Sequence, residues 1–326
     1  MVPGIVRGMA RQLRIEYPGA VYHVMNRGDR REAIFQGEPD YEAFLLALGE
    51  VCRKALWQVH AYCLMPNHLH LVLETPQPTL VAGMKWLLGT YTSRFNRRHK
   101  EFGHLFSGRY KALVVDGSGS GYLKTVCDYV HLNPARAGLL KPAQRLEEFR
   151  WSSYPFYVGR PGRRPPWLRV ERLLGEWRIA QDNAAGRRVF AAGLERRRGE
   201  DTRGEFKRVE RGWFLGEEEF GRDLLEQVSR QPGASHYGAA VQQAVEVRAE
   251  RLVRQRLQAM GWTAEDLARR RKGDPRKVGR AAEVRAQTTM PLAWIAERLV
   301  MGSRGYLAWL LCQRGKLAHE YDNIIN

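Results

Sequence analysis

Apolar and polar positions follow two alternating periods over roughly the first half of the chain. A period of two, typical of half-buried strands, recurs at 20–26, 57–64, 68–75 and 105–116. A period of three to four, typical of amphipathic helices, recurs at 39–54, 80–98 and 121–132. The order strand–helix–strand–strand–helix–strand, with one extra helix, is that of a ferredoxin-like fold. We therefore predict an α+β domain whose antiparallel sheet carries its two main helices on one face and leaves the other face open.

Beyond Trp213 the pattern is helical almost to the end of the chain. Helices are predicted at 217–228, 237–260, 264–271, 275–287, 291–299 and 304–312. The last two flank a short turn at Gly302, and the small Ala296 lets them cross closely, so this segment resembles a helix-turn-helix. A generic helical hairpin explains the same pattern. We predict an all-helical accessory domain that binds DNA, with Arg304 on the second helix facing either DNA or the core.

Segments rich in Gly, Pro, Arg and Glu and poor in apolar residues separate these two regions. We therefore divide the chain into a domain at 10–158, a linker and irregular segment at 159–212, and a helical domain at 213–316. The residues before Met9 are expected to form an unstructured extension.

The charge of the chain narrows the choice of partner. Lys and Arg number 53 against 35 Asp and Glu, a formal net charge of +18, and the pI is near 10.1. Such an excess repels itself unless a polyanion is bound, so nucleic acid is the expected partner. The content of 44% hydrophobic residues excludes a disordered chain. A basic ribosomal or membrane-surface protein is the alternative that charge alone leaves open.

The cysteines and the apolar runs indicate the compartment. Cys52, Cys63, Cys127 and Cys312 form no Cys-x-x-Cys pair, so neither a zinc knuckle nor a disulfide framework is predicted. No apolar run resembles a secretory signal or approaches the ~18 residues of a membrane span. We therefore expect a cytoplasmic, nucleoid-associated protein without a membrane partner.

The strand at 68–75 carries the first candidate chemistry. Its alternation places Leu69, Leu71 and Leu73 on one face, and His68 and His70 on the other. The leucines are expected to meet the two helices, so both imidazoles stand on the open face, where side chains two apart converge on one divalent cation. The alternative is a pair of half-exposed surface histidines.

The extra helix carries the second piece. Tyr129 and Asn133 are four residues apart and share one helix face. If this face covers the open side of the sheet, the amide oxygen of Asn133 is suited to complete a Mg²⁺ or Mn²⁺ site. The Tyr129 phenol is then a candidate nucleophile. Alternatively, Tyr129 packs as an ordinary aromatic residue, and Asn133 ends the helix before Pro134.

Together these motifs resemble a known family. The run from Met65 to Val72, followed by Tyr129, Asn133-Pro134 and the run from Arg136 to Leu139, resembles the single-tyrosine HUH transposases of the IS200-like superfamily. The runs 22–28, Ile34-Phe35 and 108–111 look like those of the branch called REP-associated tyrosine transposases. Insertion-sequence members carry Gln four residues after the tyrosine, whereas Asn133 matches the REP-associated branch.

The resemblance implies a fold and a reaction. Residues 10–158 would form an HUH catalytic domain in which His68, His70 and Asn133 hold Mg²⁺ or Mn²⁺ against a phosphate of single-stranded DNA. Tyr129 would attack that phosphate, leaving a 5′-phosphotyrosine and a free 3′-hydroxyl that can later reverse the reaction. The substrate would carry hairpin or palindromic repeats, and the enzyme would be a monomer or a homodimer.

Other aromatic and imidazole side chains compete for these roles. Tyr110 and Tyr122 lack an amide four residues later, so Tyr129 is the predicted nucleophile. The remaining candidate ligands are expected to pack or to lie near DNA; they are His23, His60, His104 and His131.

Basic side chains are expected to form the track for the substrate, since they neutralise phosphates independently of sequence. The predicted track comprises Arg27, Arg30, Arg31, Arg94, Arg97, Arg98, Arg109 and Lys111, with Arg304 in the helical domain. A solvated basic surface is the alternative. Two functional alternatives also stay open: an HUH replication initiator or relaxase, and a non-catalytic DNA-binding regulator derived from a transposase.

Overall fold

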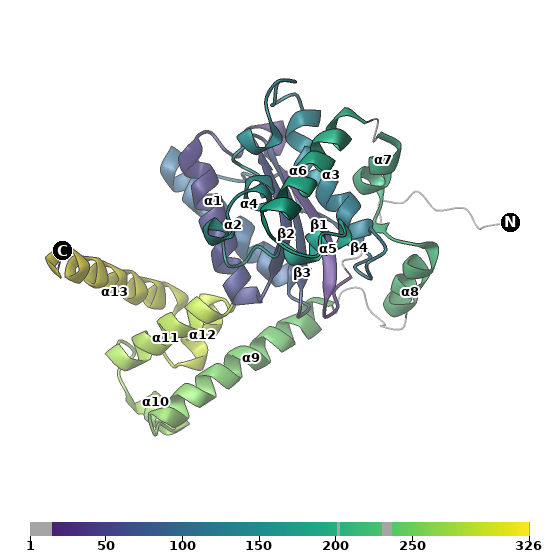
Figure 1. The fold of residues 1–326 in the computed structure, drawn as a ribbon. Coiled ribbons are helices and arrows are strands. Elements are labelled where there is room, and N and C mark those ends of the chain that lie inside the picture. The colour runs from purple at the N-terminus through teal and green to yellow at the C-terminus, as the bar shows by residue number, and fades with distance from the viewer. Residues whose placement is uncertain (1–14, 201–202, 230–236, 326) are drawn as a thin grey trace.

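The computed structural model describes residues 15–200, 203–229 and 237–325 (Figure 1). The extension expected before Met9 lies outside the described residues. None of the helices in the described part is long and apolar enough to cross a lipid bilayer.

Four strands form the predicted antiparallel sheet. They are β1 (Ala20–Arg27), β2 (Gln58–Met65), β3 (His68–Thr75) and β4 (Lys111–Val115), in the order β2-β3-β1-β4. Each neighbouring pair is antiparallel, and α1 (Glu38–Ala55) and α2 (Leu80–His99) make the two crossovers. The ferredoxin-like order predicted from the sequence is confirmed. In this register Met25 lies opposite His70, and Arg27 lies opposite His68.

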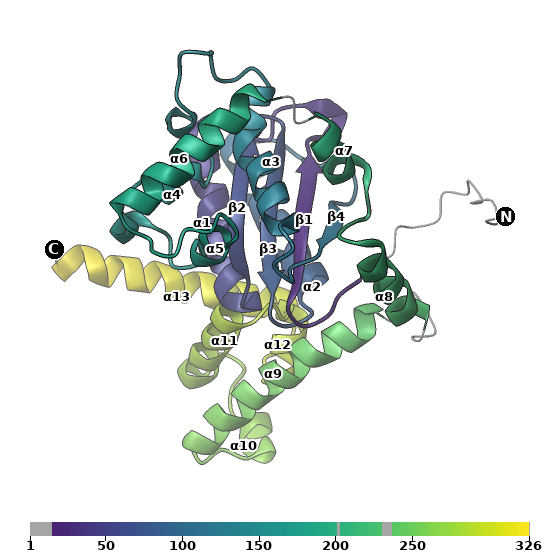
Figure 2. The same ribbon diagram turned by 45° about the vertical axis from the view of Figure 1, so that its right-hand side comes forward.

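The two faces of the sheet are covered by different helices. Figures 1 and 2 show α1 and α2 together on one side and α3 (Tyr122–Arg136) on the other. The rings of Phe44 and Tyr91 join α1 to α2, with centroids 5.1 Å apart. Gly121 and Gly138, both with positive φ, flank α3, and this backbone conformation favours glycine. The helix α3 therefore covers the sheet face that α1 and α2 leave open.

The last strand is shorter than predicted. Only Lys111–Val115 pairs with β1, whereas the prediction extended from 105 to 116. The preceding residues leave the sheet because Gly108 has a φ of +66°, and only an isolated bridge joins Phe106 to Gly28. A two-residue strand, β5 (Phe214–Leu215), pairs in parallel with β4 and extends the sheet. It is too short to show any periodicity, so the sequence did not predict it.

The segment 159–212 is not the irregular linker that the sequence predicts. It holds α5 (Glu171–Glu176), α6 (Ala184–Gly199) and α7 (Arg203–Arg211), and α4 (Tyr154–Val158) lies just before it. In Figure 2, α5 and α6 lie on the α3 side of the sheet. Their buried apolar residues are few, among them Phe190 and Leu194 on α6 and Phe206 on α7. Because apolar residues are so few in this segment, its composition resembles that of a linker.

The C-terminal region is helical, as predicted. It contains α8 (Glu218–Ser229), α9 (Tyr237–Ala259), α10 (Ala264–Arg269), α11 (Pro275–Gln287), α12 (Leu292–Arg298) and α13 (Arg304–Ile325). The helices α9 to α13 share a core of their own, which includes Trp262, Ile295 and Leu307. They lie at one end of the first domain (Figure 1), where the Lys54 ammonium of α1 donates to the carbonyl oxygen of Arg285.

Candidate active site

The two histidines of β3 lie on the face that α3 covers. Their ring centroids are 5.1 Å apart; His70 is buried and His68 is half-buried. The Nδ1 atom of His68 lies 2.7 Å from Oδ1 of Asn67, an acceptor. This hydrogen bond places the proton of His68 on Nδ1 and leaves its Nε2 atom free to bind a cation.

β1 contributes a third histidine, His23, to the same face. Its Nε2 atom lies 2.9 Å from Nδ1 of His70, and the two rings stack with centroids 5.2 Å apart. Burial lowers the pKa of His23 to about 3 and holds the pKa of His70 well below its usual value. Both rings are therefore neutral at pH 7, which is the form that binds a metal ion. His23 was expected to pack or to lie near DNA, and instead it adjoins the candidate ligands. The sequence signal for this position is the alternation of β1, which puts His23 on the same face of the sheet as His70.

α3 lays its tyrosine and its amide against these histidines. The Tyr129 ring meets His70 and His23 edge-on, at centroid distances of 5.6 and 5.7 Å. The Nδ2 atom of Asn133 lies 3.1 Å from Nε2 of His70. The structure thus brings together Tyr129, His68, His70 and Asn133, the residues predicted for chemistry.

The donor set fits one divalent cation with an incomplete protein shell. Among the described residues no group of three or more His, Cys, Asp or Glu side chains is placed to hold a metal ion. The candidate ligands are the neutral imidazoles of His68 and His70 and the carboxamide of Asn133. The amide of Asn133 would turn its oxygen toward a cation in place of the Nδ2 atom that faces His70 here. Three protein ligands leave positions for water and for a substrate phosphate.

Three further side chains surround the Tyr129 phenol. The Arg136 guanidinium lies 4.9 Å from the centroid of the Tyr129 ring, and Phe206 meets that ring edge-on at 5.3 Å. Burial, and then the charge of Glu210, raise the pKa of Tyr129, while Arg136 and Asn133 lower it; the net shift is upward. The phenol is therefore protonated at neutral pH and must lose its proton when it attacks.

The competing tyrosines lie elsewhere. Tyr122, at the start of α3, donates from its hydroxyl to Glu217, and Tyr110 is buried just before β4. In the described part of the chain, the ring contacts place neither tyrosine against His68 or His70.

A cavity of about 520 Å³ opens at this site. Four of the predicted DNA-binding residues line it together with His68, His70, Tyr129 and Glu210; they are Arg27, Arg31, Arg109 and Lys111. Arg30 is exposed in the 3₁₀ turn Asp29–Arg31, next to the cavity residue Arg31. The strand β1, its following turn and the segment leading into β4 therefore give this cavity a basic wall.

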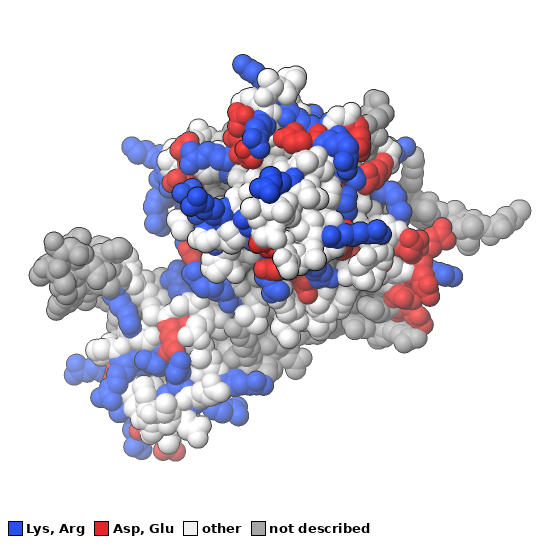
Figure 3. Space-filling view, viewed as in Figure 1, with Lys and Arg blue, Asp and Glu red and all other residues white. Residues whose placement is uncertain are grey.

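The structure does not bring the other predicted basic residues to this cavity. Arg94, Arg97 and Arg98 border a hollow between α1 and α2, where Arg94 pairs with Glu50 at 2.7 Å and Arg98 with Asp40 at 2.8 Å. Arg304 borders a separate cavity of about 590 Å³ between α2 and the C-terminal helices. Figure 3 shows basic side chains crowded on the lobe that these C-terminal helices form.

The other histidines weighed as ligands take other places. His131 is buried, and its Nε2 atom lies 2.8 Å from Oγ of Ser153. His60 is buried beside Glu74, and His104 is exposed. His60 and His131 are therefore packing residues, one of the two roles expected for them.

Residues 17–133 match the family model described as "Transposase IS200 like", which spans all four strands of the antiparallel sheet and ends at Asn133. Over these residues the chain is similar to the IS200-like transposases. A search of curated proteins finds no match to the chain. Among solved structures, the chain is similar to "the REP associates tyrosine transposase bound to a REP hairpin". The two are 16% identical with a TM-score of 0.40, and the match covers 49% of this chain and 91% of the other.

Proposed function

We propose that this chain is a metal-dependent transposase that cuts and rejoins single-stranded DNA through a 5′-phosphotyrosine at Tyr129. The observation that carries the proposal is the position of the Tyr129 ring, which lies against His70 and His23 in a cavity with a basic wall. All of these groups come from one chain, which supports an active site that is complete in a monomer.

The reaction follows from what each side chain offers. The Tyr129 oxygen attacks the phosphorus of a phosphodiester, so an O–P bond to tyrosine forms and the P–O3′ bond breaks. The phenolic proton leaves to solvent, and the departing 3′-oxygen takes up a proton to become a hydroxyl. A Mg²⁺ or Mn²⁺ ion held by His68, His70 and Asn133 supplies polarisation of the phosphate when it is bound. Attack by a 3′-hydroxyl on the phosphotyrosine reverses the step, so no ATP is consumed.

The substrate we propose is single-stranded DNA that carries a hairpin or palindromic repeat, as expected for the REP-associated branch. The support is the Asn133 that follows Tyr129 at the spacing of that branch, and the basic wall formed by Arg27, Arg31, Arg109 and Lys111. Such side chains grip a phosphate backbone without reading its sequence. Recognition of the hairpin then depends on its shape and on bases outside this wall.

We further propose that α9 to α13 bind DNA as an accessory domain. Residues 249–314 hold 14 Lys and Arg against six Asp and Glu. The helix–turn–helix candidate corresponds to α12, the turn at Met301 to Ser303, and α13, whose first residue is Arg304. Exposed Tyr306 and Trp309 stack on α13 with centroids 5.9 Å apart, in reach of a nucleic acid base or groove.

A covalent-adduct assay tests the catalytic proposal. The full chain is incubated with Mn²⁺ or Mg²⁺ and a hairpin-bearing strand labelled at its 3′ end, because the tyrosine retains the 3′ fragment. We expect a labelled protein band on a denaturing gel, absent in EDTA and absent with the fully duplex strand, and a peptide modified at Tyr129 by mass spectrometry. A chain that binds the hairpin tightly without forming any adduct would instead be the non-catalytic regulator.

A further inference from the structure

Arg136 is a basic side chain that lies against the ring of the proposed nucleophile. It lies in the last turn of α3, seven residues after Tyr129, which brings both side chains to the same helix face. Its guanidinium carbon is 4.9 Å from the Tyr129 ring centroid and 5.0 Å from that of Phe206. A cation held against the ring of the attacking tyrosine also lies near a phosphate that the tyrosine attacks.

An acidic side chain holds Arg136 in this structure. Oε1 of Glu210, on α7, accepts a hydrogen bond from Nη2 of Arg136 at 3.0 Å. Glu210 also lines the cavity that contains His68, His70 and Tyr129. A carboxylate therefore stands at the edge of a site that is built to receive a phosphodiester, and its charge has the same sign.

We propose that Arg136 binds the phosphodiester next to Tyr129, and that Glu210 occupies the guanidinium until a DNA strand replaces it. This inference rests on the proposed function and adds to it a phosphate-binding residue and the group with which the substrate competes.

The neighbouring arginines explain why Arg136 is the one able to exchange partners. Nε of Arg197 lies 3.2 Å from Oδ2 of the fully buried Asp128, and Nη2 of Arg197 lies 2.7 Å from Glu205. Arg198 donates to the carbonyl oxygens of Lys141 and Gln144 and pairs with Glu195. In contrast, the described ion pairs of Arg136 involve a single carboxylate, that of Glu210, and this side chain is 41% exposed.

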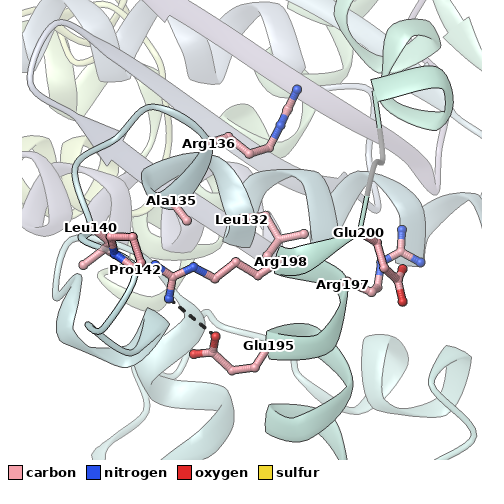
Figure 4. A pocket seen from close by; sticks show the side chains of 10 residues that line it. Leu132, Ala135, Arg136, Leu140, Pro142, Glu195, Arg197, Arg198 and Glu200 are labelled. Atoms are coloured by element: carbon pink, nitrogen blue, oxygen red, sulfur yellow. Dashed lines mark ion pairs between the residues drawn. The ribbon is translucent and has the colours of Figure 1, made fainter.

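The exchange requires only a side chain to move. Phe206 and Val209 are buried and anchor α7, and Arg197 pairs with Glu205 in the first turn of the same helix. Glu210 can therefore turn into solvent while α7 stays in place. Arg136 also borders a second cavity, of about 750 Å³, on the α6 side of α3. Figure 4 shows its side chain pointing away from Arg198 and Glu195. A strand that leaves the active site in this direction passes the guanidinium.

A double-mutant cycle on binding tests the proposal. The dissociation constant of the full chain for a short labelled single strand is measured in EDTA, where no cleavage occurs, for wild type, Glu210→Gln, Arg136→Gln and the double variant. An exposed ion pair is worth about 0.2–1 kcal/mol, so we expect Glu210→Gln to tighten binding about 1.4- to fivefold. Arg136→Gln removes a charge-assisted hydrogen bond to the phosphate. We therefore expect this variant to bind the single strand about tenfold or more weakly than wild type.

The decisive result is the dependence of one substitution on the other. If Glu210 competes for Arg136, the gain from Glu210→Gln is smaller in the Arg136→Gln background, where only the relief of direct repulsion between the carboxylate and the phosphate remains. An equal gain in both backgrounds would mean that only the net charge matters, and this would overturn the proposal. Glu38→Gln is the matched control, since Glu38 pairs with exposed Arg150 at 2.6 Å and its loss changes the net charge equally. We expect it to leave binding unchanged.

Two further measurements keep the result interpretable. Arg136→Lys keeps the charge, so its affinity for the single strand should lie between those of wild type and Arg136→Gln. If neither Arg136 variant folds, the proposal is decided by whether Glu210→Gln binds the strand more tightly than Glu38→Gln does. The adduct assay on wild type separates the two hypotheses. Coupling without an adduct would reject the proposed chemistry and keep the phosphate-binding role, whereas an adduct without coupling would reject the role of Arg136 alone.

Discussion

The Nε2 atom of His23 lies 2.9 Å from the Nδ1 atom of His70, with the two rings stacked in the buried layer between the sheet and α3. On its other side, Nε2 of His70 faces the Nδ2 atom of Asn133, which is a donor. Nε2 of His70 therefore accepts, its proton resides on Nδ1, and that proton is donated to His23. The contact fixes the tautomer and orientation that His70 needs as a ligand, so His23 supports the site from behind.

Replacing Tyr129 with Phe removes one hydroxyl and should abolish the covalent adduct. Binding of single-stranded DNA should change less than about twofold, because the ring keeps its contacts with His23, His70 and Phe206. Adduct formation is measured on a denaturing gel and binding by fluorescence anisotropy. Tyr122→Phe is the control on the same helix and should cleave normally; an adduct that persists in Tyr129→Phe but disappears in Tyr122→Phe would reassign the nucleophile.

Replacing His68 with Ala should lower the rate of metal-dependent cleavage at least about 100-fold. This is the scale of the loss when a group that stabilises transition-state charge is removed. His68 is half-buried and its Nδ1 partner is only Asn67 in the described contacts, so the fold should tolerate the change. Cleavage is titrated with Mn²⁺, and melting temperature is recorded for each variant. The exposed His104→Ala serves as the control. Undiminished cleavage by wild type in excess EDTA would reject the metal requirement.

Removal of the C-terminal helices should separate targeting from chemistry. The sequence suggests a cut near Gly212, but that cut removes β5, which pairs with β4 through Val114 and Val115. A cut after Ser229 keeps β5 and removes 17 Lys and Arg against nine Asp and Glu, or +8 of the +18. We expect unchanged cleavage of a minimal strand, with weaker binding and a flatter salt dependence on a full-length target.

Turnover of the two strands by full-length and shortened chains provides the measurement for this truncation. If the truncation lowers the cleavage rate of both DNA strands equally, α9 to α13 act on the active site itself, for example through their packing against α2. The targeting role would then be wrong. The shorter cut near Gly212 is expected to lower the melting temperature further than the cut after Ser229, since it leaves the edge of β4 unpaired.

Asp40 should make stability depend on pH in the acid range. It is buried; although burial alone would raise its pKa, hydrogen bonds from His99, Arg98 and the Gln36 backbone hold the pKa below the usual 3.8. A depressed pKa in the folded state gives stability above pH 3.8 that is lost as pH falls through the lower, folded-state value. Asp40→Asn should therefore cost about 1.5–3 kcal/mol of unfolding free energy at pH 7.

Urea unfolding between pH 7 and pH 3 checks this expectation. The difference between wild type and Asp40→Asn should stay constant down to about pH 4 and shrink below it, as the wild-type carboxyl takes up its proton. Exposed Asp29→Asn is the control and should follow wild type throughout. A difference that persists undiminished at pH 3 would show that packing, and not charge, stabilises the fold at this position.

Local pattern carried much of the prediction. The alternation in β3 determines that His68 and His70 share a face opposite three leucines, and the spacing of Tyr129 and Asn133 determines that they share a face of α3. The order of strands and helices follows from the same periodicities, which is why the ferredoxin-like sheet could be predicted. These features depend on residues a few positions apart, whose geometry the backbone periods set directly.

Tertiary structure alone decided what surrounds those groups. His23 meets His70 across 47 positions of sequence, Asn133 reaches His70 across 63, and Glu210 reaches Arg136 across 74. The strand and helix periods say nothing about contacts between residues so far apart in the sequence. These contacts result from the register of β1 against β3 and from the packing of α3 and α7. The helix α7 shows the limit best: its few apolar residues make it look like a linker, and only its packing reveals that Phe206 covers Tyr129. Composition is a local property, whereas burial depends on what packs against a helix. Two apolar residues, Phe206 and Val209, therefore anchor α7 although its composition resembles that of a linker.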